Sequence, residues 1–134
     1  MIAAVVTLVV LTSASAVAQK NSFGRIRTQL ARIPEPDPAR YRDIRDAMYW
    51  QNPYLLVRRE GVELRLGMTR TTMPVESVAS ALARLPLAGW PYGRVVAVQA
   101  LSNTSVYRYR ILSTRERLLK ILQAIGVKAE VWPA

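Results

Sequence analysis

The sequence contains neither cysteine nor histidine. Without cysteine, the chain has no thiol nucleophile and no disulfide, so the core alone must hold the fold. Without histidine, it lacks the commonest general base and metal ligand, and a Ser-His-Asp triad is excluded. A glycine-rich phosphate loop is also missing, since Gly89 and Gly93 are too few for the motif and do not precede a predicted helix. We therefore predict no catalytic residue, no cofactor and no metal site.

Carboxylates are the remaining route to catalysis. Asp43 and Asp46 are three residues apart on a predicted helix and would share a face, as an acid–base or metal-binding pair requires. Arg40, Arg42 and Arg45 alternate with them, and intrahelical ion pairs are the interpretation that this spacing favours. The sequence thus predicts a protein that is not an enzyme.

The first 18 residues have the pattern of a secretory signal peptide. Residues 2–11 are apolar except for Thr7, and small residues follow, ending in Ala16-Val17-Ala18. Cleavage after Ala18 would leave a periplasmic or extracellular protein with no stable transmembrane span. No Lys or Arg precedes Ile2, so an uncleaved anchor and a buried apolar segment stay open as alternatives.

The rest of the chain divides into two parts. Residues 19–38 are predicted to be a basic tether and a proline-rich linker, because "PEPDP" at 34–38 disfavours regular structure. Residues 39–134 are predicted to be a single domain. A short helix capped by Asp37 would run from Pro38 to about Met48, with Tyr41, Ile44 and Met48 on one side.

The pattern of apolar residues predicts an α+β fold. A hairpin over 54–66 turns at Glu60-Gly61, and 67–73 is a possible edge strand. A helix follows from Pro74, and then strands at 94–101 and 106–111. A capping box at 113–116 starts a second helix ending at Gly126, before a last strand at 127–131. The expected architecture is a four- to five-stranded sheet with two helices on one face, preceded by the short helix.

The turn Trp90-Pro91-Tyr92-Gly93 raises a question about binding. It fits a rigid corner that leads into the strand at 94–101. Exposed Trp and Tyr are also enriched in binding hot spots, so Trp90, Tyr92 and Arg94 are possible contacts for a protein partner. Of the two interpretations, the sequence favours the structural corner.

The formal net charge is +10, and all the basic residues but Lys20, Lys120 and Lys128 are arginines. Such a charge suits a polyanion: nucleic acid, anionic lipid or a wall polymer. The possible polyanion contacts are Arg25, Arg27, Arg32, Arg40 and Arg42. A GC-rich genome and solubility would also explain the arginines. Residues 107–110, "YRYR", could stack on single-stranded nucleic acid, although on a strand the tyrosines and arginines would point to opposite faces.

Residues 54–131 resemble the periplasmic domain of the biopolymer-transport proteins ExbD and TolR. The likeness lies in "LLVRREGVEL", "VESVASALARLP", "RVVAVQAL" and "RLLKILQAIGVKAEV". The family's transmembrane helix carries an acidic residue for its proton pathway, whereas residues 2–18 contain no Asp or Glu, and residues 99–102 replace the usual acidic residue after the central strand. No energy-coupling role is therefore implied.

A second resemblance concerns export. The stretches "WQNPYLLVRREGVEL", "LPLAGWPYGRVVAVQ" and "GVKAEVWP" resemble a group of small exported bacterial proteins, which implies export.

Two functions follow as expectations. The first is a non-catalytic domain that binds an envelope or secreted protein through the Trp90 corner and exposed arginines. The second is electrostatic binding of a polyanion, which would be distinguished by its steep dependence on salt.

Overall fold

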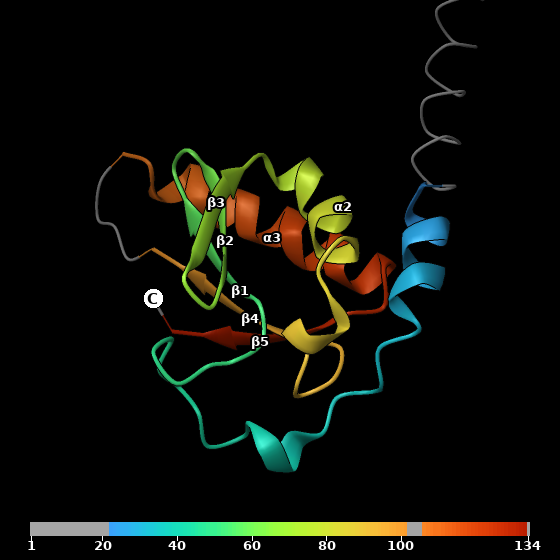
Figure 1. The fold of residues 1–134 in the computed structure, drawn as a ribbon. Helices are drawn as coiled ribbons and strands as arrows, with labels where there is room; N and C mark the ends of the chain where they lie inside the picture. The colour runs from blue at the N-terminus through green and yellow to red at the C-terminus, as the bar shows by residue number, and fades with distance from the viewer. Residues whose placement is uncertain (1–21, 102–105, 134) are drawn as a thin grey trace, which may run out of the picture.

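A five-stranded mixed sheet forms the centre of the protein. The structure is a computed structural model that describes residues 22–101 and 106–133 (Figure 1). The strands are β1 (Tyr54–Arg58), β2 (Gly61–Leu66), β3 (Thr69–Met73), β4 (Val95–Ala100) and β5 (Lys128–Trp132). The helical segments that follow residue 31 are η1 (Pro38–Arg40), η2 (Val75–Ser77), α2 (Val78–Ala83), η3 (Leu87–Gly89) and α3 (Arg108–Ala124), and residues 22–30 are also helical. The predicted α+β fold is confirmed.

The strand order is β3-β2-β1-β4-β5. β1 and β2 form the predicted antiparallel hairpin, in which Arg58 pairs with Gly61 across a two-residue turn. β3 extends the hairpin as an edge strand, whereas β4 lies parallel to β1 and β5 lies parallel to β4. The carboxyl ends of β1, β4 and β5 therefore share one edge of the sheet.

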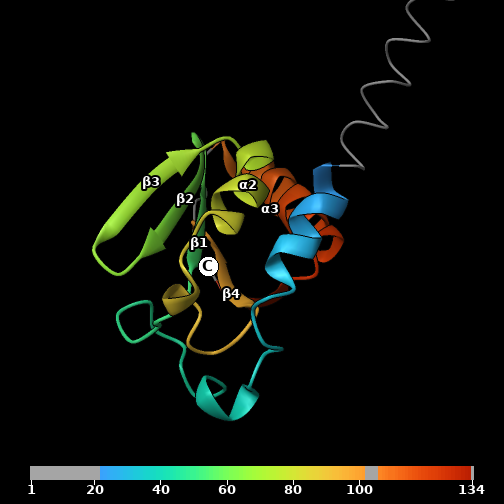
Figure 2. The same cartoon turned by 45° about the vertical axis from the view of Figure 1, so that its right-hand side comes forward.

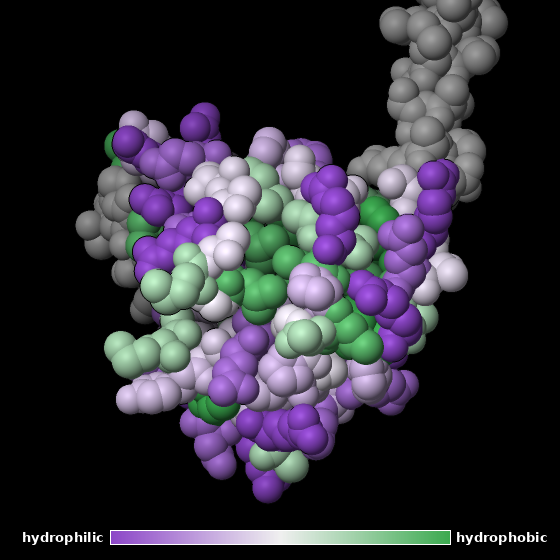
Figure 3. Space-filling view, in the orientation of Figure 1, coloured by the Kyte–Doolittle hydropathy of each residue, from purple (hydrophilic) through white to green (hydrophobic). Residues whose placement is uncertain are grey.

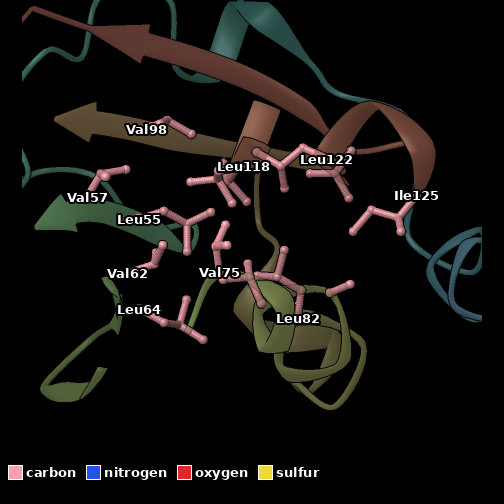
Figure 4. Close-up of a cluster of buried hydrophobic side chains, with 14 of the residues drawn as sticks. Leu55, Val57, Val62, Leu64, Val75, Leu82, Val98, Leu118, Leu122 and Ile125 are labelled. Carbon is pink, nitrogen blue, oxygen red and sulfur yellow. The ribbon is translucent and has the colours of Figure 1, made fainter. Parts of the chain in front are cut away.

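One face of the sheet carries the main core. Strand residues such as Leu55 and Val98 point toward Leu82 of α2 and toward Leu118 and Leu122 of α3 (Figure 4). All five side chains are at most 1% exposed. Helices are thus packed on one face, as predicted, and the helical segment 22–30 joins them there (Figure 2).

The opposite face of the sheet is covered by a loop rather than by helices. A second cluster of buried residues lies there: Tyr41, Trp50, Tyr54, Leu56, Tyr92, Val95, Ala97 and Trp132. Trp50 is at its centre, with its ring centroid 5.6 Å from that of Tyr41, 5.0 Å from Tyr92 and 5.4 Å from Trp132, each in an edge-on arrangement. Such aromatic pairs stabilise a core beyond their buried area, so this cluster fixes the loop to the sheet.

The strand predicted at 106–111 is wrong, because α3 begins at Arg108. Six alternating residues fit a strand, but Ile111 belongs to a longer pattern. It is buried with Leu118, Leu122 and Ile125, and these spacings place all four on one side of a helix. The predicted capping box at 113–116 consequently lies inside the helix. The end of the helix was predicted correctly: Gly126 has φ +77°, the left-handed conformation common after a helix.

The predicted tether is also wrong for the residues that the structure describes. Residues 22–30 are helical, and Ile26, Leu30 and Ile33 are buried in the main core. Their spacings of four and three residues form a narrow apolar stripe. Residues 22–33 are therefore part of the domain. The predicted signal peptide at 1–18 lies outside the described residues, and within those residues no helix is long and apolar enough to cross a membrane.

The helix predicted from Pro38 to Met48 is reduced to η1 and separate turns. Asp37 makes no side-chain capping hydrogen bond. Tyr41 and Trp50 are both buried against the sheet, whereas Met48 is 80% exposed. On a continuous helix, Tyr41 and Trp50 would lie about 180° apart, at about 100° per residue, so both could not face the sheet. Burial of the two rings therefore outweighs local helix formation.

Replacing Leu30 tests whether residues 22–33 complete the core. Leu30 is 0% exposed, so we expect Leu30→Ala to lower the free energy of unfolding by about 2–5 kcal/mol. Urea unfolding followed by tryptophan fluorescence measures this loss. Gln29→Ala changes an exposed residue in the same helical segment and should have little effect. Equal stability of the two variants would instead support the prediction that these residues are a tether outside the core.

Candidate functional site

The predicted contact residues Trp90 and Tyr92 lie in the interior. Trp90 is 3% exposed and belongs to the main core, whereas Tyr92 is 6% exposed and packs in the aromatic cluster on the other face. Arg94, directly before β4, is partly buried. The prediction of Trp90 and Tyr92 as partner contacts is therefore corrected: the two rings point to opposite sides of the corner and fasten it to both cores.

The backbone of this corner also holds the residues that precede η1. Arg94 N donates to Pro34 O at 2.9 Å, and Asp37 N donates to Tyr92 O at 2.9 Å. Gly93, with φ +90°, lies so close to this segment that an added Cβ would be 2.3 Å from Glu35 O. The glycine is therefore required both by its conformation and by the space it leaves for the neighbouring chain.

Asn52 connects the loop to the corner from the other side. Its side chain is buried, and Nδ2 donates to Gly93 O and to Val95 O, both at 2.8 Å. Its Oδ1 accepts a hydrogen bond from Tyr92 N at 2.8 Å. One amide side chain thus satisfies three buried backbone groups, which would be costly to leave unpaired.

Removal of this amide should destabilise the whole loop. We expect Asn52→Ala to lower the free energy of unfolding by about 2 kcal/mol or more, because three buried backbone groups lose their partner. Thermal and urea unfolding measure the loss. The matched control is Gln51→Ala, since the Gln51 side chain is exposed. A loss below about 0.5 kcal/mol for Asn52→Ala would mean that other groups or water replace the amide.

The five arginines predicted to bind a polyanion do not form one surface. The helical segment 22–30 lies at one end of the molecule and η1 at the other, as both ribbon views show (Figures 1 and 2). Figure 3 likewise shows hydrophilic residues in several separate areas of one face. The segment that carries Arg25 and Arg27 is thus remote from the one that carries Arg40, and a polyanion that contacts all five arginines would have to span the molecule.

Three of these arginines instead stabilise the fold. Arg27 Nη1 donates to Ala124 O at 3.4 Å at the end of α3, and Arg32 Nη2 donates to Leu85 O at 2.9 Å. Arg40 Nη1 donates to Pro91 O at 2.9 Å, and its Nε lies 3.5 Å from Asp37. Each guanidinium therefore joins an amino-terminal segment to a distant carbonyl.

The carboxylate pair Asp43 and Asp46 does not form the predicted arrangement. The two residues lie in turns rather than on a helix, and among the described residues neither forms an ion pair. Asp46 Oδ1 accepts a hydrogen bond from Met48 N at 2.9 Å. Within residues 22–101 and 106–133, no group of three or more acidic side chains is placed to hold a metal ion.

A groove lies where the β1–β2 turn and η2 meet the first half of α3. Its volume is about 500 Å³. We call it the α3 groove; it is lined by Arg59, Glu60, Gly61, Val75, Glu76, Tyr109, Arg110, Ser113, Thr114 and Arg117. It opens beside the carboxyl end of β1, and such edges of parallel strands commonly bind ligands.

The α3 groove contains more positive than negative charge. Arg117 pairs with Glu76, and Arg59 Nε lies 3.0 Å from Glu60. Hydrogen bonds from its own backbone N–H and from Arg59 hold the pKa of Glu60 below its ordinary value, so this carboxylate is ionised at neutral pH. Arg110 forms no ion pair or hydrogen bond with any described residue, and it leaves one excess positive charge in the groove.

A second depression, of about 650 Å³, lies between the loop and the sheet. We call it the loop hollow; its lining residues are Asp46, Ala47, Met48, Trp50, Gln51, Asn52, Tyr54, Arg65, Gly67 and Arg70. Arg65 Cζ is 5.5 Å from the centre of the Tyr54 ring. Burial raises the pKa of Tyr54, so its hydroxyl stays protonated and donates to Gln99.

Glu63 lies buried beside the loop hollow, with its side chain 8% exposed. Its Oε2 is 3.1 Å from Arg65 Nη2 and 3.5 Å from Arg58 Nη1. Burial opposes ionisation, but the two guanidinium groups outweigh it and hold the pKa of Glu63 below the ordinary 4.5. Glu63 lies between Val62 and Leu64 in β2, and all three residues are buried. A buried carboxylate needs opposite charges beside it, and the two arginines provide them.

The lowered pKa of Glu63 predicts a dependence of stability on pH. In the unfolded chain Glu63 has its ordinary pKa of 4.5, so the stabilisation from the ionised side chain is fully present above about pH 4.5. It is lost as the pH falls through the lower pKa that Glu63 has in the folded protein. Glu63→Gln should be less stable at neutral pH and should lose less stability than the wild type between about pH 5 and pH 3. Urea unfolding across this range measures the difference. Glu116→Gln, at an exposed position on α3, is the control. If stability falls with pH in parallel for Glu63→Gln and the wild type, the pKa of Glu63 is not lowered in the folded protein.

Sequence reasoning missed both depressions. Tyr109 and Arg110 were considered together on a strand, whereas on α3 they line the α3 groove. Arg65 and Arg70 were not considered as site residues. The register of β2 and β3, which the sequence left ambiguous at 67–73, is what brings these two arginines together.

Comparison with known proteins gives no relative: no family model matches the chain, and no curated protein or solved structure is significantly similar to it. The resemblance to ExbD and TolR therefore stays a prediction.

Proposed function

We propose that this protein is a non-catalytic binding domain that acts outside the cytoplasm and holds an acidic segment of a partner protein in the α3 groove. The absence of His and Cys from the sequence supports a function without catalysis. The signal-like pattern of residues 1–18 supports export.

The observation that carries the proposal is the composition of the α3 groove. Arg110 provides a guanidinium with no described partner, and Tyr109 beside it is 85% exposed. Arginine and tyrosine are the residues enriched in binding hot spots, because each combines a large contact area with directed hydrogen bonds. An acidic segment would pair with Arg110 and pack against the Tyr109 ring.

The arrangement of the remaining arginines favours a protein partner over a polyanion. A polyanion needs a continuous track of phosphate-binding cations, since each bound phosphate contributes separately. Here Arg27, Arg32 and Arg40 donate to backbone carbonyls in separate places. In the α3 groove, Glu60 and Glu76 interrupt the positive charge and would repel a uniform polyanion. They would also restrict the partner to a segment whose acidic residues match Arg110.

The test uses the purified protein and a fluorescent peptide in which Asp and Glu alternate with Leu and Tyr. We expect Arg110→Glu to weaken binding at least tenfold, because the segment would meet a like charge. Arg42→Glu makes the same change of charge at an exposed arginine remote from the groove, and it should have less than about a threefold effect. Fluorescence anisotropy gives the dissociation constants.

The same measurement with single-stranded DNA tests the alternative function, which is electrostatic binding of a polyanion. If DNA binds more tightly than the peptide, loses affinity steeply with salt and is affected equally by both variants, the polyanion function is supported and the acidic segment is rejected. Unchanged peptide binding by Arg110→Glu would also reject the α3 groove as the site.

A further inference from the structure

The loop hollow contains two arginines that lie directly opposite each other. Arg65 on β2 and Arg70 on β3 are register partners, so both side chains project from the same face of the sheet. Like charges at directly opposite positions destabilise a sheet. Glu63 neutralises Arg65, but Arg70 has no ion pair or hydrogen bond with any described residue. Arg70 is therefore a guanidinium without a direct partner among the described residues.

The acidic side chain that lines the hollow is not paired with either arginine. Asp46 lines the hollow, but its Oδ1 accepts a hydrogen bond from Met48 N at 2.9 Å, and it forms no ion pair with the described arginines. A carboxylate or phosphate group of a ligand would fit here, because a guanidinium presents paired donors to two oxygens of such a group.

An exposed apolar side chain also lines the same hollow. Met48, in the loop that forms one wall, is 80% exposed. Unbranched, polarisable methionine side chains adapt to apolar ligands of varied shape. The exposure of Met48 in a charged depression indicates a ligand with an apolar chain as well as a charge.

We propose that the loop hollow binds a small anionic amphiphile, with its carboxylate or phosphate group on Arg70 and Arg65 and its hydrocarbon chain against Met48. The volume of about 650 Å³ lies within the range of small-molecule sites. The wall is held in place by the hydrogen bonds of Asn52, so the site is formed before the ligand arrives. This site is separate from the α3 groove and does not depend on the proposed function.

The test is a titration of the full chain with decanoate and with decyl phosphate, both below their micellar concentrations, followed in ¹H–¹⁵N NMR spectra. We expect shifts confined to residues 46–52 and 65–70. Arg70→Gln should weaken binding about tenfold or more, and Met48→Ser about threefold. Arg42→Gln is the matched control, because it removes an exposed arginine outside the hollow. The spectra of the variants also report whether they are folded.

Ligands that lack one part of the amphiphile complete the test. Decanol lacks the charge and inorganic phosphate lacks the chain, so each should bind at least tenfold more weakly than decyl phosphate. Tighter binding of decanoate identifies a fatty carboxylate, and tighter binding of decyl phosphate identifies a lipid phosphate. Equal binding of decanol or of free phosphate would overturn the proposal, as would shifts centred on the α3 groove or equal effects of Arg70→Gln and Arg42→Gln.

Discussion

The hydrogen bonds of Asn52 are the interaction on which the far side of the sheet depends. A buried amide reaches three backbone groups in residues 92–95 and thereby fixes the loop that carries Trp50. Trp50 in turn contacts Tyr41, Tyr92 and Trp132, so the loop, the corner and the end of β5 are held together. The covering segment, residues 34–53, contains only the short helix η1 and turns. Its order comes from one polar side chain and a set of aromatic contacts, whereas the helix face relies on aliphatic packing.

Apart from the arginines that pair with glutamates, two groups of arginines differ in their partners. Arg27, Arg32 and Arg40 donate to main-chain carbonyls and hold the amino-terminal segments to the sheet domain. Arg70 and Arg110 have no described partner, and each lies in a depression with an exposed apolar or aromatic neighbour. Total charge alone would not distinguish these roles. The positions of the carbonyls and carboxylates around each guanidinium do so.

Much of the fold could be predicted, because strands such as β1 and β4 are continuous apolar segments bounded by turn residues. The errors arose where local and long-range patterns disagree. Residues 106–111 alternate like a strand, but Ile111 is buried in line with Leu118 of α3. In residues 22–33 only three apolar side chains mark the buried stripe, too few to stand out among polar neighbours. The depressions could not be predicted, since each is lined by segments that meet only after folding.

The contact between the amino-terminal segment and the end of α3 affects the order in which the chain can fold. Arg27 and Ala124 are 97 positions apart, and Leu30 is buried in a core that includes Leu118 and Leu122. During synthesis the helical segment 22–30 emerges first and must wait for nearly the whole chain before its apolar stripe is covered. Long-range contacts of this kind slow folding and leave apolar surface transiently exposed. A nascent chain stopped before α3 would therefore lack part of its core and be prone to aggregate.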